Sequence, residues 1–307
     1  MKSLRLRLQF WSPIGSLLQS DTIFGQFAWE YRYLYGEHKL KEVMAEFERL
    51  PFVVFSDAFP KDLLCMPLLK PKKLSEIREF FKEKYPDLDY YSQVKRLKKS
   101  KYVKVDRKWM DINALNIFSL YPYLPESVRI AHGIFIRNSI NRLNNRVEEG
   151  LYSTTETFWG SEVDIYVKYR EDLISKNVIV DVFESIGLFG FGRDKSTGKG
   201  RFKVIDVVDE PDVLKSKDAG TFVSLSSGIP DDSCDVLYGK VFTKFGKHGG
   251  YLVFGNPFKN PAVLYKSGSV FKTKEKKEIY GKALGLSKYE GHYQNTYMIP
   301  LFVDVEE

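Results

Sequence analysis

Residues 187–204 have the sequence GLFGFGRDKSTGKGRFKV, and the predicted fold and site are both built around this segment. Five glycines lie between residues 187 and 200, interleaved with basic and hydroxyl side chains. Because glycine lacks a Cβ atom, such a loop can adopt positive φ angles and bring backbone amides close to a ligand. Consecutive amides form anion sites, and cationic side chains favour a phosphate backbone. The segment predicts a phosphate-binding loop, with a flexible basic surface hairpin as the alternative.

Two familiar nucleotide-binding motifs do not match this loop. A P-loop has four residues between its glycines, followed by Lys and then Ser or Thr. Here five residues separate Gly192 from Gly198, and Gly200 follows Lys199. A dinucleotide-binding fingerprint requires a glycine where Lys195 stands. The loop therefore favours a polyanion over a free mononucleotide.

The composition of the chain favours a nucleic-acid partner. Its 307 residues suit two domains, or one domain with large insertions, and 43% hydrophobic residues are enough for a core. A net charge of +7 and a pI near 9.0 favour an acidic partner, of which nucleic acid is the commonest. The N-terminal segment lacks the pattern of a signal peptide, and no apolar stretch approaches the ~20 residues of a membrane span. We therefore expect no membrane contact.

The cysteines and histidines predict neither a metal site nor a cofactor. Cys65 and Cys234 stand far apart without metal-ligand spacing, which is typical of isolated thiols in a reducing cytosol. The four histidines are scattered, and no two of them stand four residues apart as zinc-binding helices require. The expected location is cytoplasmic.

The order of predicted elements indicates an α+β fold. The pattern predicts, in this order, a strand over 4–10 and a helix that Ser20 or Asp21 caps and that runs to Tyr35. A strand near 52–55, the return strand of a hairpin over 155–169, a helix over 172–185 and a strand over 201–208 follow. This is the order of a ferredoxin-like βαββαβ unit. We expect such a unit over 1–208, with the glycine-rich loop at 187–200. Residues 209–307 show mainly short strands and predict a degenerate, strand-rich second ferredoxin-like (RRM-like) domain, with strands at 221–225, 236–243, 251–254, 263–265, 269–271 and 297–305.

Two insertions are expected in the first domain. One, at about 60–110, carries a basic run over 95–108 that is either a solvated face or a contact with nucleic acid or an acidic protein. The other, at about 130–165, is a long hairpin whose return strand begins after a turn at 148–152. Its polar, cationic tip includes two aliphatic residues, a mixture that suits an aliphatic wedge between nucleotides with flanks that hold the backbone. The predicted tip residues are Arg137, Asn138, Ile140, Asn141, Arg142, Asn144 and Arg146.

Several landmarks resemble one family when they are taken together and in order. They are LRLRLQFWSPIGSLLQSDTIFGQFAW (4–29), FSDAFP (55–60), KRLKKSKYVKV (95–105), NSINRLNNR (138–146), GFGRDKSTGKGRF (190–202) and, more weakly, QNTYMIPLFVDV (294–305). The chain resembles the family of the fourth subunit of the Csm complex, a type III-A CRISPR RNA-guided antiviral effector, within the RAMP superfamily. The glycine loop alone would indicate only the superfamily.

This resemblance implies a non-catalytic RNA-binding subunit that anchors the 5′ tag of the CRISPR RNA. It also implies a large subunit with cyclase and DNase activities, docked at the base of the effector, and an adjacent backbone RAMP subunit as partners. The hairpin would be the thumb that displaces a nucleotide, and the helix opened by Ser20 and Asp21 would lie along the RNA backbone. The glycine-rich loop would hold tag phosphates through Gly190, Gly192, Arg193, Lys195, Ser196, Thr197, Gly198, Lys199, Gly200 and Arg201.

Two other functions remain open at this point. One is a RAMP-type endoribonuclease that processes precursor CRISPR RNA without a metal, for which His132, just before the tip of the hairpin, is the best candidate catalytic residue. The other is an adaptor whose basic surfaces contact an acidic protein. Cleavage of repeat RNA in EDTA distinguishes the first, and retention of the partner after nuclease treatment distinguishes the second.

Overall fold

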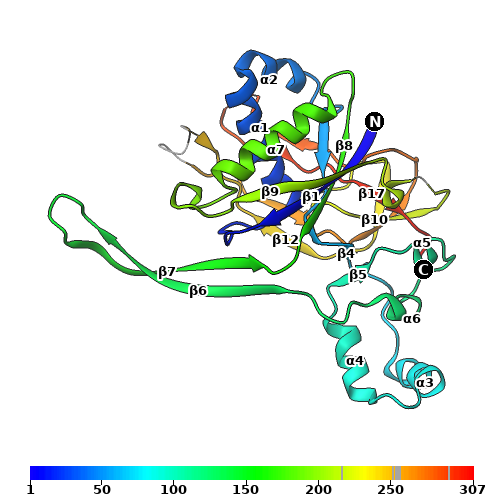
Figure 1. Cartoon of the computed structure of the whole chain (residues 1–307). Coiled ribbons are helices and arrows are strands. Elements are labelled where there is room, and N and C mark those ends of the chain that lie inside the picture. Colours follow the sequence, from blue (N-terminus) through cyan, green and yellow to red (C-terminus); the bar gives the residue numbers. More distant parts are fainter. Residues whose placement is uncertain (216, 251, 253–256, 290) are drawn as a thin grey trace.

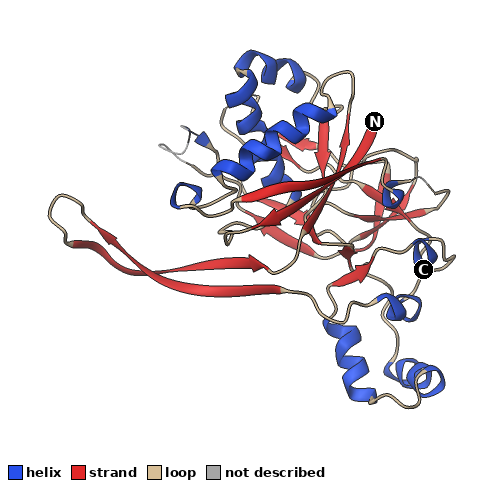
Figure 2. Ribbon diagram, in the orientation of Figure 1, coloured by secondary structure: helices blue, strands red, loops and turns tan. Residues whose placement is uncertain are grey.

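The computed structural model describes residues 1–215, 217–250, 252, 257–289 and 291–307 (Figure 1). A body built on two antiparallel sheets carries a long two-stranded ribbon and a small helical lobe, both of which project from it (Figure 2). The α-helices are α1 (Ser20–Tyr35), α2 (Glu37–Met44), α3 (Leu74–Lys84), α4 (Tyr90–Lys99), α5 (Arg107–Met110), α6 (Ile117–Leu120) and α7 (Lys176–Phe189). Short 3₁₀ turns are η1 (Tyr121–Tyr123), η2 (Lys195–Thr197) and η3 (Asp212–Leu214).

The strands of the N-terminal part alternate with these helices. They are β1 (Lys2–Phe10), β2 (Val53–Phe55), β3 (Phe59–Pro60), β4 (Leu63–Cys65), β5 (Tyr102–Lys104), β6 (Ile130–Ile140), β7 (Val147–Trp159), β8 (Val163–Tyr169) and β9 (Phe202–Asp209). The C-terminal strands are β10 (Thr221–Ser224), β11 (Cys234–Tyr238), β12 (Val241–Lys244), β13 (Ala262–Tyr265), β14 (Val270–Thr273), β15 (Ala283–Leu284), β16 (Gln294–Asn295) and β17 (Pro300–Phe302).

The first sheet has the strand order β2-β8-β1-β9, and all of its pairings are antiparallel. Helix α1 connects β1 to β2, and helix α7 connects β8 to β9, so each helix joins two strands that a third strand separates. The alternating residues Leu4, Leu6 and Leu8 of β1 are buried, as the sequence pattern predicts. On β1, Arg7 also forms an ion pair with Asp164 of β8 at 2.7 Å.

The second sheet repeats this order of strands without the helices. Its order is β11-β14-β10-β17, so the second, third, first and fourth strands in chain order lie side by side, as in the first sheet. In the described residues of the β10–β11 and β14–β17 connections there is no helix. One hydrophobic core nevertheless runs through both halves of the body, because Val223, Ile299 and Leu301 belong to the same buried cluster as Leu4 and Phe27.

The helical lobe is the basic insertion, and it is longer than the sequence suggests. Helices α3, α4 and α6 pack around a small separate core of Ile77, Phe81, Leu97, Tyr121 and Leu124. The lobe therefore continues to about residue 124, whereas the predicted insertion ends near 110. Much of the basic run lies on α4, whose buried face is limited to Leu97.

Some element boundaries differ from the predicted ones. The turn of the hairpin lies at 141–146, and the ribbon ends at Trp159, where the Gly160 amide donates to the Arg129 carbonyl at 2.7 Å. Helix α7 begins at residue 176 because the Ser175 hydroxyl caps it. The predicted strand over 236–243 divides into β11 and β12, which belong to different sheets. The predicted strand over 251–254 lies almost entirely outside the described residues.

The N-terminus of α1 is capped by a distant carboxyl group. The predicted caps, Ser20 and Asp21, are instead the first residues of the helix, and Gln19 occupies the N-cap position without a side-chain hydrogen bond. The buried Asp57 carboxyl accepts from the Ser20 amide at 2.8 Å, from the Ser227 amide at 3.1 Å and from the Ser227 hydroxyl at 2.8 Å. Burial raises the pKa of Asp57, although these hydrogen bonds act in the opposite direction. Asp57 therefore ties α1 to the C-terminal half of the body.

We expect Asp57→Ala to destabilise the protein considerably more than Asp57→Asn. Alanine leaves two buried amides without an acceptor, at about 1–3 kcal/mol each, whereas asparagine keeps one acceptor oxygen. Because the folded-state pKa of Asp57 is raised, its neutral form is favoured in the fold, and its contribution to stability falls as the pH rises through that pKa. The stability of Asp57→Asn relative to the parent protein should therefore increase from pH 4 to pH 8 in urea unfolding. A relative stability independent of pH would contradict this account.

Candidate nucleic-acid interface

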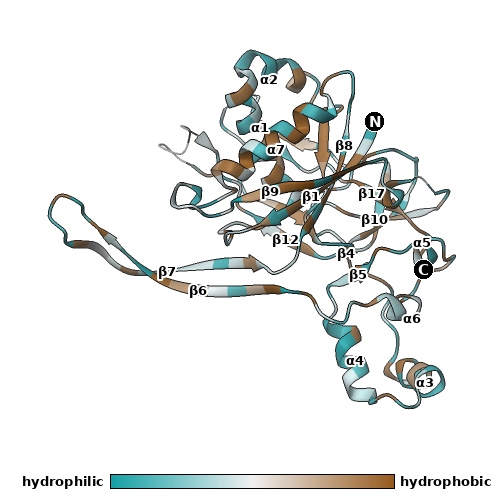
Figure 3. Cartoon of the chain, viewed as in Figure 1, coloured by the Kyte–Doolittle hydropathy of each residue, from teal (hydrophilic) through white to brown (hydrophobic). Residues whose placement is uncertain are grey.

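The ribbon of β6 and β7, residues 130–159, is called the thumb from here on. It projects from the body, and only its base packs against other elements (Figure 1). Cross-strand pairing places His132 opposite Thr157 and Ile134 opposite Thr155 on one face, and Arg137 opposite Tyr152 on the other. Large apolar side chains are exposed along it, including Ile134 and Ile136. Figure 3 shows hydrophobic and hydrophilic positions mixed along the ribbon. An isolated ribbon of this kind is only marginally stable in water, so its attachment at the base matters.

The tip of the thumb is a turn held by its own side-chain hydrogen bonds, and it carries two arginines without an ion-pair partner among the described residues. The Asn141 and Asn144 side chains accept hydrogen bonds from the amides of Leu143 and Arg146, and so hold the turn itself. Arg142 and Arg146 are exposed and form no ion pair with any described residue. Beside them, Leu143 is 97% exposed, and Ile140 and Asn138 are exposed as well. The tip offers two positive charges and an aliphatic surface together.

A buried carboxylate, Glu156 on β7, joins the base of the thumb to the glycine loop, defined as residues 190–201. Its Oε1 lies 2.7 Å from Lys199 Nζ and 2.5 Å from Arg137 Nη2. Lys199, itself buried, also contacts Asp194 Oδ2 at 2.9 Å. Arg137 donates a further hydrogen bond to the Thr154 hydroxyl at 3.1 Å. Two cations that the sequence assigned to RNA are therefore engaged with protein carboxylates.

The electrostatics of Glu156 follow from this arrangement. Burial works to raise the pKa of Glu156, but hydrogen bonds and charge from Lys199 and Arg137 outweigh it and lower the pKa. Glu156 is not among the residues that the sequence predicts for the site. It stands in TTETF, where alternation alone cannot say that it shares a face with Arg137 until the position of the hairpin turn is known.

Most backbone amides of the glycine loop already have protein acceptors. Phe191 and Gly200 form a backbone hydrogen bond at 2.9 Å, and Gly200 donates to the Pro13 carbonyl at 2.9 Å. The loop packs against residues 12–16, which also pair with Thr157 of the thumb. Other amides with protein acceptors are those of Gly190, Arg193, Thr197, Gly198 and Arg201. The expected cradle of free backbone amides is therefore largely occupied by the protein itself.

Packing alone is sufficient to explain why glycine stands at Gly190 and Gly200. Both have positive φ angles, of 99° and 73°. A Cβ at Gly190 would lie 2.2 Å from the Lys199 carbonyl oxygen, and a Cβ at Gly200 would lie 2.2 Å from the Phe191 carbonyl oxygen. The side chains that the loop leaves at the surface are those of Arg193, Ser196, Thr197 and Arg201, with Lys195 half-buried. Arg193 is partly engaged, since its Nη2 donates to the Thr155 carbonyl at 3.0 Å.

The remaining predicted residues, Ser20 and Asp21, are buried. The Ser20 hydroxyl donates to the Ser227 carbonyl at 3.0 Å. The Asp21 carboxylate accepts from Lys244 at 2.9 Å and from the Gln294 amide at 2.7 Å. In this structure both residues connect α1 to the C-terminal half of the chain, far in sequence from the thumb tip and the glycine loop.

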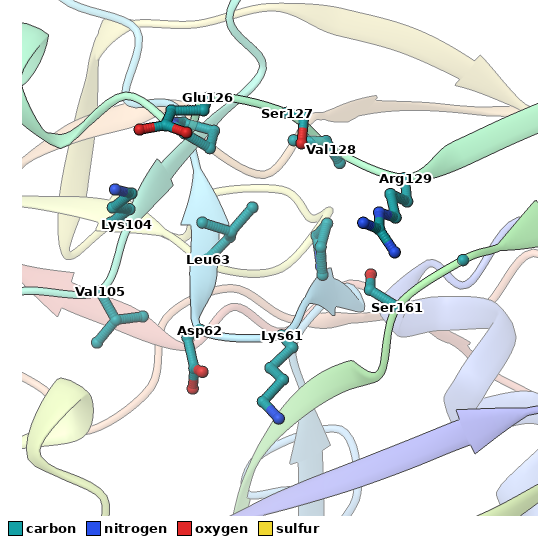
Figure 4. Close-up of a pocket in the computed structure, with 13 residues that line it drawn as sticks. Lys61, Asp62, Leu63, Lys104, Val105, Glu126, Ser127, Val128, Arg129 and Ser161 are labelled. Atoms are coloured by element: carbon teal, nitrogen blue, oxygen red, sulfur yellow. The ribbon is translucent and has the colours of Figure 1, made fainter.

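Two open cavities flank residues 125–129, which cross from the lobe to the thumb. The first, of about 610 Å³, is lined by Lys61, Lys104 and Arg129 from three separate segments (Figure 4). Figure 4 also shows Ser161 beside Arg129. The second, of about 490 Å³, lies between the lobe and the base of the thumb and includes His132.

Neither a metal cluster nor a membrane-spanning helix is present in the described ranges. No group of three or more His, Cys, Asp or Glu side chains there could hold a metal ion. No helix in that part of the chain is both long and apolar enough to cross a bilayer. Cys65 and Cys234 are both buried free thiols.

We expect Glu156→Gln to destabilise the base of the thumb by about 3 kcal/mol, since removal of one partner of a buried ion pair has a cost of this order. Because the pKa of Glu156 is lowered in the fold, its stabilisation is complete above about pH 4.5, its ordinary value, and is lost as the pH falls through the folded-state pKa. The difference in unfolding free energy between parent and variant should therefore shrink between pH 6 and pH 3.

A surface variant is the matched control for this measurement. Glu171 pairs with Lys2, and both side chains are more than half exposed. Glu171→Gln should therefore change the stability by less than about 1 kcal/mol at any pH. Equal effects of the two substitutions would rule out a central role for Glu156.

Comparison with known proteins identifies relatives by fold alone. No family model and no curated protein matches the sequence. Among solved structures, the chain is similar to one in "Crystal structure of Csm1-Csm4 cassette in complex with AMPPNP", with a TM-score of 0.63, 16% identity and all of both chains covered. It is also similar to one in "Crystal structure of Csm3-Csm4 subcomplex in the type III-A CRISPR-Cas interference complex", with a TM-score of 0.57, 16% identity, and 99% of this chain and 100% of that chain covered.

Csm4 is the subunit named in both of these assemblies. At 16% identity the likeness establishes the fold, over essentially the whole length of both chains. The resemblance that the sequence indicates is confirmed at this level: the chain has the fold of a chain from Csm4-containing assemblies of the type III-A CRISPR system.

Proposed function

We propose that this chain is a Csm4-type subunit of a type III-A CRISPR RNA-guided antiviral effector, and that it anchors the 5′ tag of the CRISPR RNA. The full-length match in fold supports the subunit role. RNA binding is inferred from the thumb tip, where Arg142 and Arg146 form no ion pair with any described residue and lie beside exposed Ile140 and Leu143. Cations of this kind hold phosphates, and the aliphatic side chains insert between bases.

In this proposal the glycine loop contacts the RNA through side chains and not through backbone amides. Ser196, Thr197 and Arg201 are exposed on it, on an element that Glu156 joins to the base of the thumb. Hydroxyl and guanidinium groups bind phosphate without reading the base. Lys199 acts as a positioning residue, because it holds the loop through Glu156 and Asp194.

The proposed protein partners are a large cyclase and DNase subunit and an adjacent backbone RAMP subunit. Two of the structural relatives support this, since one is a Csm1–Csm4 cassette and the other is a Csm3–Csm4 subcomplex. We expect the assembly to work in the cytoplasm.

We interpret the two sheets as two ferredoxin-like units, at 1–208 and 209–307. The first supports this through its helices, which connect its strands in the βαββαβ order. The second supports it through its strand order, which repeats that of the first without helices. The shared core makes the two units a single packed body.

The double variant Arg142→Ala/Arg146→Ala should bind tagged CRISPR RNA more weakly and with a lower dependence on salt. Each lost phosphate contact to a single strand lowers the slope of log K against log salt by about 0.7, so removal of two should lower it by about 1.4. Filter binding between 50 and 300 mM salt measures both quantities.

The control for this experiment removes the same charge elsewhere. Lys39 and Lys41 are exposed on α2, on the side of the body opposite the lobe (Figure 1). Lys39→Ala/Lys41→Ala should leave the slope almost unchanged. If the thumb variant binds with the parent slope, the thumb does not hold the RNA backbone and the proposal fails at that point.

The subunit is proposed to be non-catalytic, with metal-independent RNA cleavage at His132 as the second candidate. The second cavity favours the latter, since it gathers His132, Tyr102 and Lys101. Burial raises the pKa of Tyr102 further above neutrality, so its phenol could serve only as the acid, and His132 would have to be the base.

Incubation of repeat RNA with the protein in EDTA separates the two candidates. We expect no discrete product from either the parent protein or His132→Ala. A product formed by the parent protein and lost in His132→Ala would establish the endoribonuclease instead.

A further inference from the structure

The second cavity brings together three segments that are remote in sequence. Residues 96 and 99–102, on α4 and directly after it, form one wall, and residues 14, 17 and 18 form another. The third wall is the base of the thumb together with residues 125–128, which lead into it. Its volume of about 490 Å³ lies within the 300–1,000 Å³ range of small-ligand pockets. The size is therefore suitable for one nucleotide.

The thumb presents a single face to this cavity. Ile130 and His132 line it from β6, and their directly opposed partners Trp159 and Thr157 line it from β7. The same face continues outward through Ile134 and Ile136, both exposed. One surface with aromatic and aliphatic side chains therefore leads from the cavity along the thumb.

The opposite wall supplies positive charge that the protein does not use. Lys99 and Lys101 are exposed and line the cavity, and neither forms an ion pair with a described residue. Arg96, in contrast, is engaged, because it donates to the Leu124 carbonyl at 2.9 Å and lies over the Tyr121 ring. Glu126 is the acidic residue among those lining the cavity.

The first cavity is a weaker candidate by the same criteria. Its Lys61 pairs with Glu162 at 2.9 Å, and its Asp62 pairs with Arg7. Glu126 lines both cavities, whereas Asp62 adds a second carboxylate to the first one only. The aromatic side chains Tyr102 and Trp159 line the second cavity and not the first.

A polar group at the second cavity also lacks a partner. The indole Nε1 of Trp159 is shielded from solvent and has no acceptor among the described residues. A buried donor without an acceptor lowers stability.

We propose that this cavity binds one nucleotide of a single-stranded RNA, with the base against Trp159 and Tyr102 and the phosphate beside Lys99 and Lys101. Aromatic stacking and unpaired lysines are the two elements of single-strand recognition. The proposal rests on the proposed function and extends it, because it assigns the basic run of the lobe a role in holding RNA. The strand would pass from the thumb tip along the Ile134 face into the cavity.

A charge-matched pair of variants tests this assignment. Lys99→Ala/Lys101→Ala removes two charges that line the cavity. Lys95→Ala/Lys98→Ala removes two exposed charges from α4, the helix that ends at Lys99, and these two lysines line neither cavity. With full-length protein and tagged RNA, the first variant should lose about 1.4 from the salt slope and bind several-fold more weakly, and the second should remain close to the parent. Equal effects of the two variants would overturn the proposal that the cavity binds a nucleotide, and would indicate instead that RNA contacts the whole basic surface of the lobe.

A second experiment locates the bound RNA on the protein instead of measuring its affinity. RNA that carries single 4-thiouridine substitutions is bound, irradiated and analysed by mass spectrometry. A cross-link to Tyr102 or Trp159, lost on Lys99→Ala/Lys101→Ala, supports the proposal, whereas cross-links confined to the thumb tip overturn it.

Free AMP and UMP are tested as competitors: competition at low concentration identifies a pocket for one nucleotide unit, and competition only by oligonucleotides shows that neighbouring contacts along the strand are needed.

Comparing the cavity variant with the thumb variant on the same RNA distinguishes a failure of the cavity proposal from a failure of the proposed function. If Arg142→Ala/Arg146→Ala weakens binding and Lys99→Ala/Lys101→Ala does not, the cavity proposal fails while the proposed function stands. If neither variant weakens binding, both fail.

Discussion

The arrangement of the interface depends on one buried carboxylate, Glu156. It lies on the thumb and holds Arg137 of the facing strand together with Lys199 of the glycine loop. A two-stranded ribbon has no core of its own, so its orientation must be imposed where it meets the body. A buried charge imposes orientation strictly, because it is costly in every position in which its partners are absent. The thumb can therefore expose apolar residues along its length and still leave the body in one direction.

The same logic of buried polar links recurs between the two halves of the body. Asp57 accepts from amides on both sides of the junction, and Asp21 accepts from Lys244 and Gln294 of the C-terminal half. Ser20 and Asp21, at the start of α1, are residues that the sequence predicts to contact RNA, yet their side chains are already hydrogen-bonded or paired within the protein. In this chain the N-terminus of α1 links the two halves of the body, and the thumb and the lobe both carry cations without an ion-pair partner among the described residues.

The structure thus separates the residues that build the interface from those that are available to a ligand. Arg137 and Lys199 pair with carboxylates, and Asn141 and Asn144 hold a turn. Arg142, Arg146, Lys99 and Lys101 carry charge that no described residue neutralises. Unpaired charge on a projecting element is accessible to a polyanion at little desolvation cost, whereas a buried pair must first be broken. If the chain binds RNA as proposed, substitutions of the unpaired cations change binding, and substitutions of the buried pairs change folding.

Local signals in the sequence determined much of this fold. The alternation of β1, the length of α1 and its end at Gly36, the existence of the hairpin and the strand-rich C-terminal half were all predictable, because they depend on neighbours within a few residues. The family resemblance was predictable too, because it depends on motifs and on their order along the chain. The ends of the thumb, the extent of the lobe and the split of β11 from β12 were not, since each depends on where the chain meets another element.

The tertiary structure alone decided which of the candidate residues are free. Lys199 and Arg142 both lie in basic, polar stretches of the sequence. Lys199 forms an ion pair with Glu156, 43 positions away, whereas Arg142 forms none with any described carboxylate. The Ser20 amide and the Ser227 amide converge on the same oxygen of Asp57 across 207 positions. Burial and ion pairing are properties of such distant encounters, and no local pattern records them. The sequence determined the kinds of side chain present at the interface, and the fold determined which of them remained available to a ligand.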